Sequence, residues 1–187
     1  ACLDKYSVQY PYARSLCARN WLLLESGDAA AARLGMERDI KKAQDARAGL
    51  FFPLMYITLS EACLATGTAA QGLEAIETAF NIIHAGERLF EAEAWRLKGE
   101  LLRLEKKTGQ AEQCFRTALK VASEQSALAL ELRAATSLGE LHRDTRQAPD
   151  AGERLQVIID RFTEGFDTAD FRKASALAAS LVATKTT

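Results

Sequence analysis

Apolar residues recur every three or four positions along most of the chain, which is the spacing of one face of an amphipathic helix. Short clusters of glycine, proline and small polar residues interrupt this pattern, and they supply the residues that end helices and form turns. No segment alternates apolar and polar residues over the length of a strand. The pattern therefore predicts an all-helical protein. Its helices are expected at residues 7–25, 28–47, 51–66, 69–85, 89–107, 110–124, 127–146, 149–163 and 168–183.

Small residues recur at a nearly constant interval in every second predicted helix. They are Ala32, Gly72, Ala111 and Ala151, which are spaced by 40, 39 and 40 positions. Two helices can cross at close range only where the side chains between them are small. Because the predicted connections are also short, consecutive helices should pack antiparallel. The period predicts helical hairpins and one further helix, at residues 7–47, 51–85, 89–124 and 127–163 and at 168–183.

One hairpin carries the fullest version of this repeat, with spacings of 4, 3, 9, 4 and 3 between Trp95, Gly99, Leu102, Ala111, Phe115 and Ala118. This set resembles the tetratricopeptide (TPR) repeat, and weaker copies of it recur in the other hairpins. The resemblance implies an all-α fold, a right-handed α-α superhelix of four hairpins that forms a single domain over residues 1–187. Asn20 and Ser60 replace the glycine of the motif, and the period exceeds the usual value of about 34 residues.

The helix expected at 168–183 has no partner helix in this register. Asp167 or Thr168 can cap its first turn, and we expect Phe162 and Phe166 to pack beneath it. A stack of hairpins leaves an open apolar end, which solenoids usually cover with an atypical terminal element. We therefore interpret residues 168–183 as a capping helix.

Three segments, Phe90–Leu102, Glu131–Leu138 and Phe162–Asp170, carry a closer resemblance. Together they resemble the C-terminal repeat region of a family of bacterial multidomain regulators. In that family a signalling ATPase domain precedes the repeats, and an adenylate/guanylate cyclase domain of class III or a winged-helix DNA-binding domain lies further upstream. The resemblance implies a cytoplasmic regulatory arm that belongs to a longer protein, to which the start at Ala1 rather than methionine also points.

Composition argues against several classes of partner. The 24 lysines and arginines are balanced by 25 acids, which gives a formal net charge of −1 and disfavours nucleic-acid binding. The chain contains no apolar run long enough for a membrane span and no export signal.

Its cysteines, Cys2, Cys17, Cys63 and Cys114, are too far apart for a zinc knuckle or a redox pair. We expect them to be reduced and buried, as is typical of the cytoplasm.

The sequence offers little that could carry catalysis. Two glycine-rich motifs commonly bind phosphate groups, Gly-x-x-x-x-Gly-Lys-Ser/Thr and Gly-x-Gly-x-x-Gly after a strand. The sequence contains neither of them. His84 and His142 lie in different hairpins and lack further ligands at metal-binding spacing. Cys63 falls at a packing position rather than beside an activating base. We therefore predict no catalytic residues, no cofactor and no metal.

In TPR solenoids the first helix of each hairpin lines a concave groove where partner peptides bind. The corresponding residues in the first two hairpins are mainly apolar: Arg14, Trp21, Leu24, Leu54, Ile57 and Glu61. Those in the next two hairpins are mainly charged: Glu93, Arg96, Glu100, Arg103, Arg133, Glu140 and Arg143.

The two halves of this groove call for different interpretations. If exposed together, Trp21, Leu24, Leu54 and Ile57 would form an apolar patch that a peptide or helix, a second copy or an upstream domain must cover. Arg96 and Glu100 have the spacing of a helix-surface pair, and we favour solvated pairs worth a few tenths of a kcal/mol.

These expectations favour a non-catalytic module for protein–protein or intramolecular regulatory contact, with a protein or peptide as its partner. One alternative is a sensor that binds a small effector molecule in the groove, which predicts a pocket with convergent polar groups near Trp21 and Tyr56. Another is a helical enzyme, which would need perturbed carboxylates or histidines that face each other in a cleft. The oligomeric state is left open.

Overall fold

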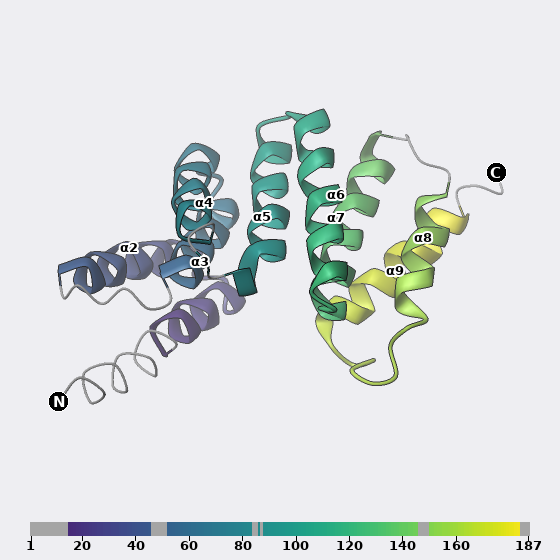
Figure 1. The fold of residues 1–187 in the computed structure, drawn as a ribbon, viewed down its shortest axis with the longest axis horizontal. Coiled ribbons are helices and arrows are strands. Elements are labelled where there is room, and N and C mark those ends of the chain that lie inside the picture. Colours follow the sequence, from purple (N-terminus) through teal and green to yellow (C-terminus); the bar gives the residue numbers. More distant parts are fainter. Residues whose placement is uncertain (1–14, 46–51, 84–85, 87, 146–149, 184–187) are drawn as a thin grey trace. The chain divides into compact units, whose positions relative to one another are not determined.

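A computed structural model describes residues 15–45, 52–83, 86, 88–145 and 150–183. Within these ranges the regular secondary structure consists of helices, with no strand, which confirms the all-helical prediction (Figure 1). The chain divides into two compact units, Ala1–Phe90 and Glu91–Thr187.

The first unit contains a helical segment over residues 15–25, followed by three α-helices and a short 3-10 helix. These are α2 (Ala29–Asp45), α3 (Phe52–Ala65), α4 (Ala69–Ile83) and η1 (Arg88–Phe90). Helix α3 packs against both α2 and α4. The core of this unit includes a cluster of buried residues from the first helical segment, α2 and α3: Leu16, Cys17, Met36, Ile40 and Met55.

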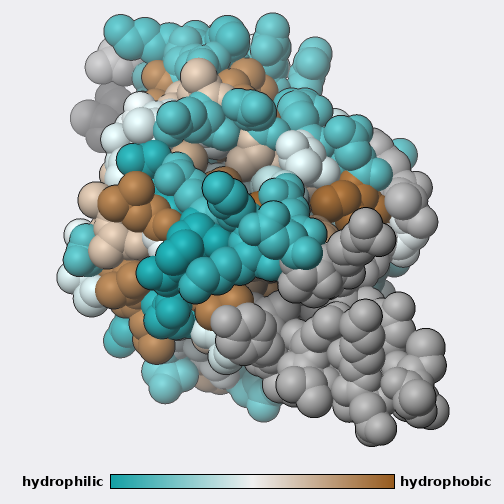
Figure 2. Space-filling view, turned by 90° about the vertical axis from the view of Figure 1, so that its left-hand side faces the viewer, coloured by the Kyte–Doolittle hydropathy of each residue, from teal (hydrophilic) through white to brown (hydrophobic). Residues whose placement is uncertain are grey.

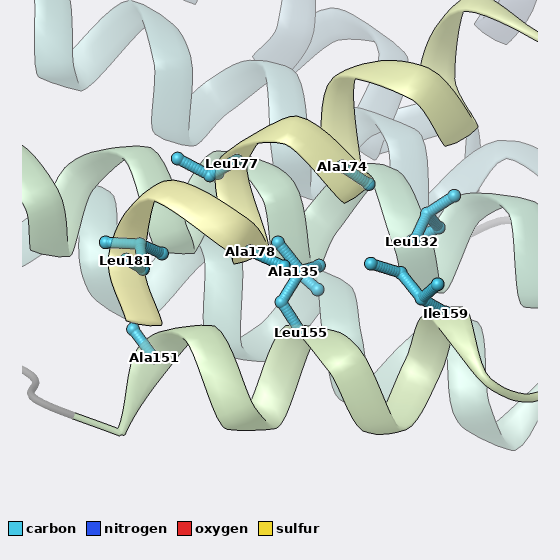
Figure 3. Close-up of a cluster of buried hydrophobic side chains, with 9 residues drawn as sticks. All are labelled: Leu132, Ala135, Ala151, Leu155, Ile159, Ala174, Leu177, Ala178 and Leu181. Atoms are coloured by element: carbon cyan, nitrogen blue, oxygen red, sulfur yellow. The ribbon is translucent and has the colours of Figure 1, made fainter. Parts of the chain in front are cut away.

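The second unit contains α5 (Glu91–Leu104), α6 (Thr108–Glu124), α7 (Leu128–Thr145), α8 (Ala151–Ile159) and α9 (Ala169–Ala183). Each helix packs against the next one in sequence, and α7 also packs against both α5 and α9. Alternate helices of this unit are therefore neighbours, with α7 between α5 and α9 (Figure 1). Apolar side chains of α7, α8 and α9 meet in one buried cluster, which includes Leu132, Leu155 and Leu177 (Figure 3).

Four helix ends share one turn geometry. Gly27, Gly67, Lys106 and Ser126 have φ values of 87°, 72°, 61° and 54°, and after each of them the next N–H donates to the carbonyl five positions earlier at 2.9 Å. This left-handed conformation is easy for glycine but strained for lysine and serine. The helices expected at 89–107 and 110–124 place the break at residues 108–109, but Gly109 lies inside α6 and the turn is made by Lys106.

The predicted small positions are buried. Ala32, Ala111 and Ala151 are at most 5% exposed, and the Ser60 hydroxyl donates to the Gly72 carbonyl at 3.1 Å. Each small residue is followed, four positions later, by a large apolar residue that is at most 1% exposed. These large residues are Met36, Ile76, Phe115 and Leu155. The near-40-residue period of the sequence is thus a period of buried positions.

Helix α8 is shorter than expected, because it ends at Ile159 rather than at residue 163. Arg161 and Phe162 donate to carbonyls only three positions earlier, so the chain leaves the helix through a tightened turn. The aromatic residues that follow pack on α9, since the rings of Phe162 and Phe166 lie 5.5 and 5.2 Å from that of Phe171. The Thr168 hydroxyl caps α9 by accepting from the Phe171 N–H at 3.3 Å.

Candidate interaction face

A row of charged side chains runs over α5, α7 and α9 in the second unit. We call this row the charged face and define it by Glu93, Arg96, Glu100, Arg103, Arg133, Glu140, Asp144, Asp170 and Lys173. On each helix these residues recur at intervals of three, four or seven, which places them on one side of the helix. The packing of α7 between α5 and α9 then brings the three sets together.

The centre of the charged face is buried. Arg96 is 9% exposed, and its guanidinium contacts Glu93 twice, at 2.7 and 3.0 Å. It lies 3.8 Å from Glu100 and donates to the Ser137 hydroxyl of α7 at 3.4 Å. The interpretation of Arg96 and Glu100 as a solvated surface pair is therefore wrong, because α7 covers this side of α5.

Ion pairs also join the three helices. Arg133 of α7 bridges Glu93 of α5 at 3.1 Å and Asp170 of α9 at 3.7 Å. Arg103 of α5 contacts Glu140 of α7 at 3.5 Å, and Lys173 of α9 contacts the same carboxylate at 2.9 Å. Each helix thus supplies counter-ions to its neighbour, which holds the side chains of the face in a defined arrangement.

The side chains of the charged face differ in how far they are exposed to solvent. The side chains of Glu93, Arg96, Glu100 and Glu140 are only 9–15% exposed. Those of Arg103 and Arg133 are 32% and 31% exposed, whereas Asp144, Asp170 and Lys173 are more than half exposed. Arg143, the last predicted groove residue, is 51% exposed and lies 3.4 Å from Asp144.

The apolar residues predicted for the first half of the groove do not form one exposed patch. Ile57 is only 3% exposed, because it belongs to the core of the first unit. Leu24, Leu54 and Glu61 are partly buried, and Trp21 is 47% exposed. The face drawn in Figure 2 accordingly shows hydrophobic residues in separate groups between hydrophilic ones. Arg14 lies outside the described residues.

A pocket of about 320 Å³ lies over α3, between α2 and α4. Its lining combines carboxylates, an aromatic ring and small polar groups: Glu37, Tyr56, Leu59, Cys63, Gln71, Glu74, Ala75 and Thr78. Glu37 pairs with Arg33 at 2.7 Å, and the Tyr56 hydroxyl accepts from Gln44 at 3.0 Å. Tyr56 thus lines a pocket, as the sensor alternative predicts, whereas Trp21 is not among its lining residues.

The first unit also buries a polar cluster that we did not expect. Asp39 is 2% exposed and pairs with Arg19 and Arg38, while the Asn20 amide donates to Asp39 at 3.2 Å. The near-40-residue period could have indicated this cluster. The positions 40 and 79 residues after Asp39 are Ala79 and Ala118, which are fully buried, so the period places Asp39 at a buried position as well. A carboxylate in a register of buried alanines needs a partner within the core.

The described cysteines, Cys17, Cys63 and Cys114, are free and buried, as predicted; Cys2 lies outside the described residues. Burial raises the pKa of Cys17 to about 11 and also raises the pKa of Cys63. Both of these thiols are therefore protonated near neutral pH, which is the opposite of what a nucleophilic cysteine requires.

His142 is buried, at 6% exposed, and its Nε2 atom is 3.4 Å from a carboxylate oxygen of Glu112. A hydrogen bond from Arg116, and to a lesser extent one from His142, lowers the pKa of Glu112.

Over the described ranges, no group of three or more histidines, cysteines and acids could hold a metal ion. Among the same residues, no helix is both long and apolar enough to cross a membrane.

Comparison with known proteins returned no match, either to a protein-family model or to a curated protein. The charged face and the pocket over α3 are two features of the described residues from which a function can be argued.

Proposed function

We propose that this chain is a non-catalytic, TPR-like interaction module that binds a segment of another protein, or of another domain of its own chain, on the charged face. In this proposal the hairpins form a right-handed superhelix, and the module is the cytoplasmic regulatory arm of a bacterial signalling protein linked to a cyclase or to transcription. The TPR and regulator resemblances described above support this architecture and context, as does the recurrence of the buried positions.

The observation that carries the proposal is the network of ion pairs that joins α5, α7 and α9. Arg96 and its two carboxylates are almost fully buried, which costs solvation free energy that apolar residues in the same places would avoid. Arginines held by such pairs lose little side-chain entropy when a partner binds. The charged face is therefore preorganised for recognition of polar groups at fixed positions.

The proposal is tested by selecting a displayed random-peptide library against the full chain. Amide chemical-shift changes caused by a selected peptide should fall on α5, α7 and α9, because these helices supply the charged face. Changes confined to α6 and α8, or the absence of any selected peptide, would contradict the proposal.

The α3 pocket supports a second candidate, a sensor for a small effector molecule. Its volume of about 320 Å³ is at the lower end of the range for small-molecule sites, about 300–1,000 Å³. If this candidate is right, one compound of a metabolite panel should raise the melting temperature of the chain. A Tyr56→Ala variant should lose this rise and a Trp21→Phe variant should keep it, since Trp21 does not line the pocket. A panel without effect on the wild-type chain argues against the sensor.

A further inference from the structure

The α3 pocket has a counterpart in the second unit. A smaller pocket of about 110 Å³ lies over α7, between α6 and α8. Its lining includes residues that stand 79 positions after lining residues of the α3 pocket, which is two intervals of the repeat. Arg116, Ala135, Leu138, His142 and Arg154 correspond in this way to Glu37, Tyr56, Leu59, Cys63 and Ala75. The repeat thus forms a pocket at the same place in each unit, and the side chains determine what each pocket can hold.

The two pockets differ in the charge of their linings. Two carboxylates line the α3 pocket, that of Glu37 on α2 and that of Glu74 on α4, and the described lining includes no basic side chain. The pocket over α7 is lined instead by Arg116 and Arg154. The charged groups that line the two pockets therefore have opposite signs.

The acids of the α3 pocket are more accessible than the base beside them. The side chain of Glu37 is 42% exposed, whereas that of Arg33, with which it pairs, is 24% exposed. The Arg33 guanidinium also donates to the side-chain oxygen of Gln71 at 3.4 Å. Glu74 is exposed, and within the described part of the chain no cation pairs with its carboxylate. One acid in the wall of the pocket is therefore open to a cationic ligand.

We infer that the α3 pocket binds a small organic amine, whose ammonium group contacts Glu74 and whose apolar part lies on Tyr56 and Leu59. The inference rests on the sensor candidate of the proposed function and specifies the chemical class of the effector. An ammonium group has three hydrogen-bond donors, and the hydroxyl oxygens of Thr78 and Tyr56 offer acceptors besides the two carboxylates. The ring of Tyr56 adds to the attraction, because the face of an aromatic ring is negative.

Other charged ligands fit this pocket less well. A metal ion takes more ligands than two carboxylates supply. An anion would have to approach Arg33 past Glu37 and Glu74, which are more exposed and repel it. Lys41 and Glu77 stand within one turn of lining residues on α2 and α4, and they add one charge of each sign. The surroundings of the pocket therefore leave its excess of acid unchanged.

The test titrates the full chain with two amines and with carboxylates that have the same apolar parts, and follows amide chemical shifts. The amines are butylamine and phenethylamine, and the carboxylates are pentanoate and 3-phenylpropionate. At least one amine should shift amides of α3 and α4, and its matched carboxylate should bind more weakly. Glu74→Gln should weaken amine binding about two- to fivefold, since an ion pair at an exposed carboxylate is lost. Tyr56→Leu should weaken it by a similar factor, about two- to fivefold, because the aromatic ring is lost.

Glu153→Gln is the matched control. It removes the same charge at the position 79 residues after Glu74, on α8, and should leave amine affinity unchanged. Equal affinity of the wild-type chain and the Glu74→Gln variant would overturn the inference even if Tyr56→Leu failed to fold. Shifts spread over exposed acids of both units would also overturn it, because they would show attraction of cations without a site.

Other outcomes separate this inference from the proposed function. If the carboxylates bind the α3 pocket more tightly than the amines, the inference fails while the sensor candidate stands. If none of these probes and no compound of the metabolite panel binds the pocket, both fail. Binding of a protein segment on the charged face is then still decided by the peptide library.

Discussion

Replacing Arg96 by alanine should destabilise the second unit by about 3 kcal/mol, the lower end of the range for removing one partner of a buried ion pair. The substitution leaves Glu93 and Glu100 nearly buried without the cation that lies 2.7 and 3.8 Å from them. It also removes the hydrogen bond from Arg96 to Ser137, which joins α5 to α7. The free energy of unfolding can be followed in urea through the fluorescence of Trp95 on α5, in a Trp21→Phe background.

Arg116 provides the matched control for this experiment. It forms a helix-surface pair with Glu112 at 2.7 Å, but its side chain is 52% exposed, so Arg116→Ala should change stability by no more than about 0.5 kcal/mol. Adding Glu93→Gln and Glu100→Gln to Arg96→Ala should recover part of the loss, because the buried charges are then removed together. Equal effects of Arg96→Ala and Arg116→Ala would show that the charged face is solvated after all.

The difference between these two arginines marks the limit of prediction from this sequence. Both have an acid four positions away on the same helix, and helical spacing alone assigns both to a surface pair. Burial depends on what the next helix covers, and Arg96 lies where α7 packs on α5. Local patterns therefore predict six of the nine members of the charged face, but neither Asp144, Asp170 and Lys173 nor the division of the face into buried and accessible side chains.

The helices and their crossings could be predicted because they follow from short-range patterns. Apolar periodicity placed most helix ends within a few residues, and the recurrence of small residues identified positions such as Ala32 and Ala111, which are fully buried. The turn at Lys106 escaped prediction because a left-handed lysine has no signal in its residue type.

Replacing Gly99 by alanine tests the repeat register most directly. A Cβ atom at this position would lie 2.4 Å from Cε1 and 2.6 Å from Cδ1 of Phe115, whose side chain is fully buried. Because a ring in the core cannot swing away, the two helices of the hairpin must move apart. Such overpacking costs about 1–3 kcal/mol, which outweighs the gain in helix propensity of up to about 1 kcal/mol.

Gly109 is the control, since it also lies in a helix but a Cβ atom there would meet nothing within 4 Å. Gly109→Ala should therefore leave stability unchanged or raise it by up to about 1 kcal/mol. Phe115→Leu should lessen the penalty of Gly99→Ala in the double variant, because the smaller side chain gives the new methyl group room. If Gly99→Ala is as stable as Gly109→Ala, then α5 and α6 do not cross at Gly99, and the small residues of the repeat have another role.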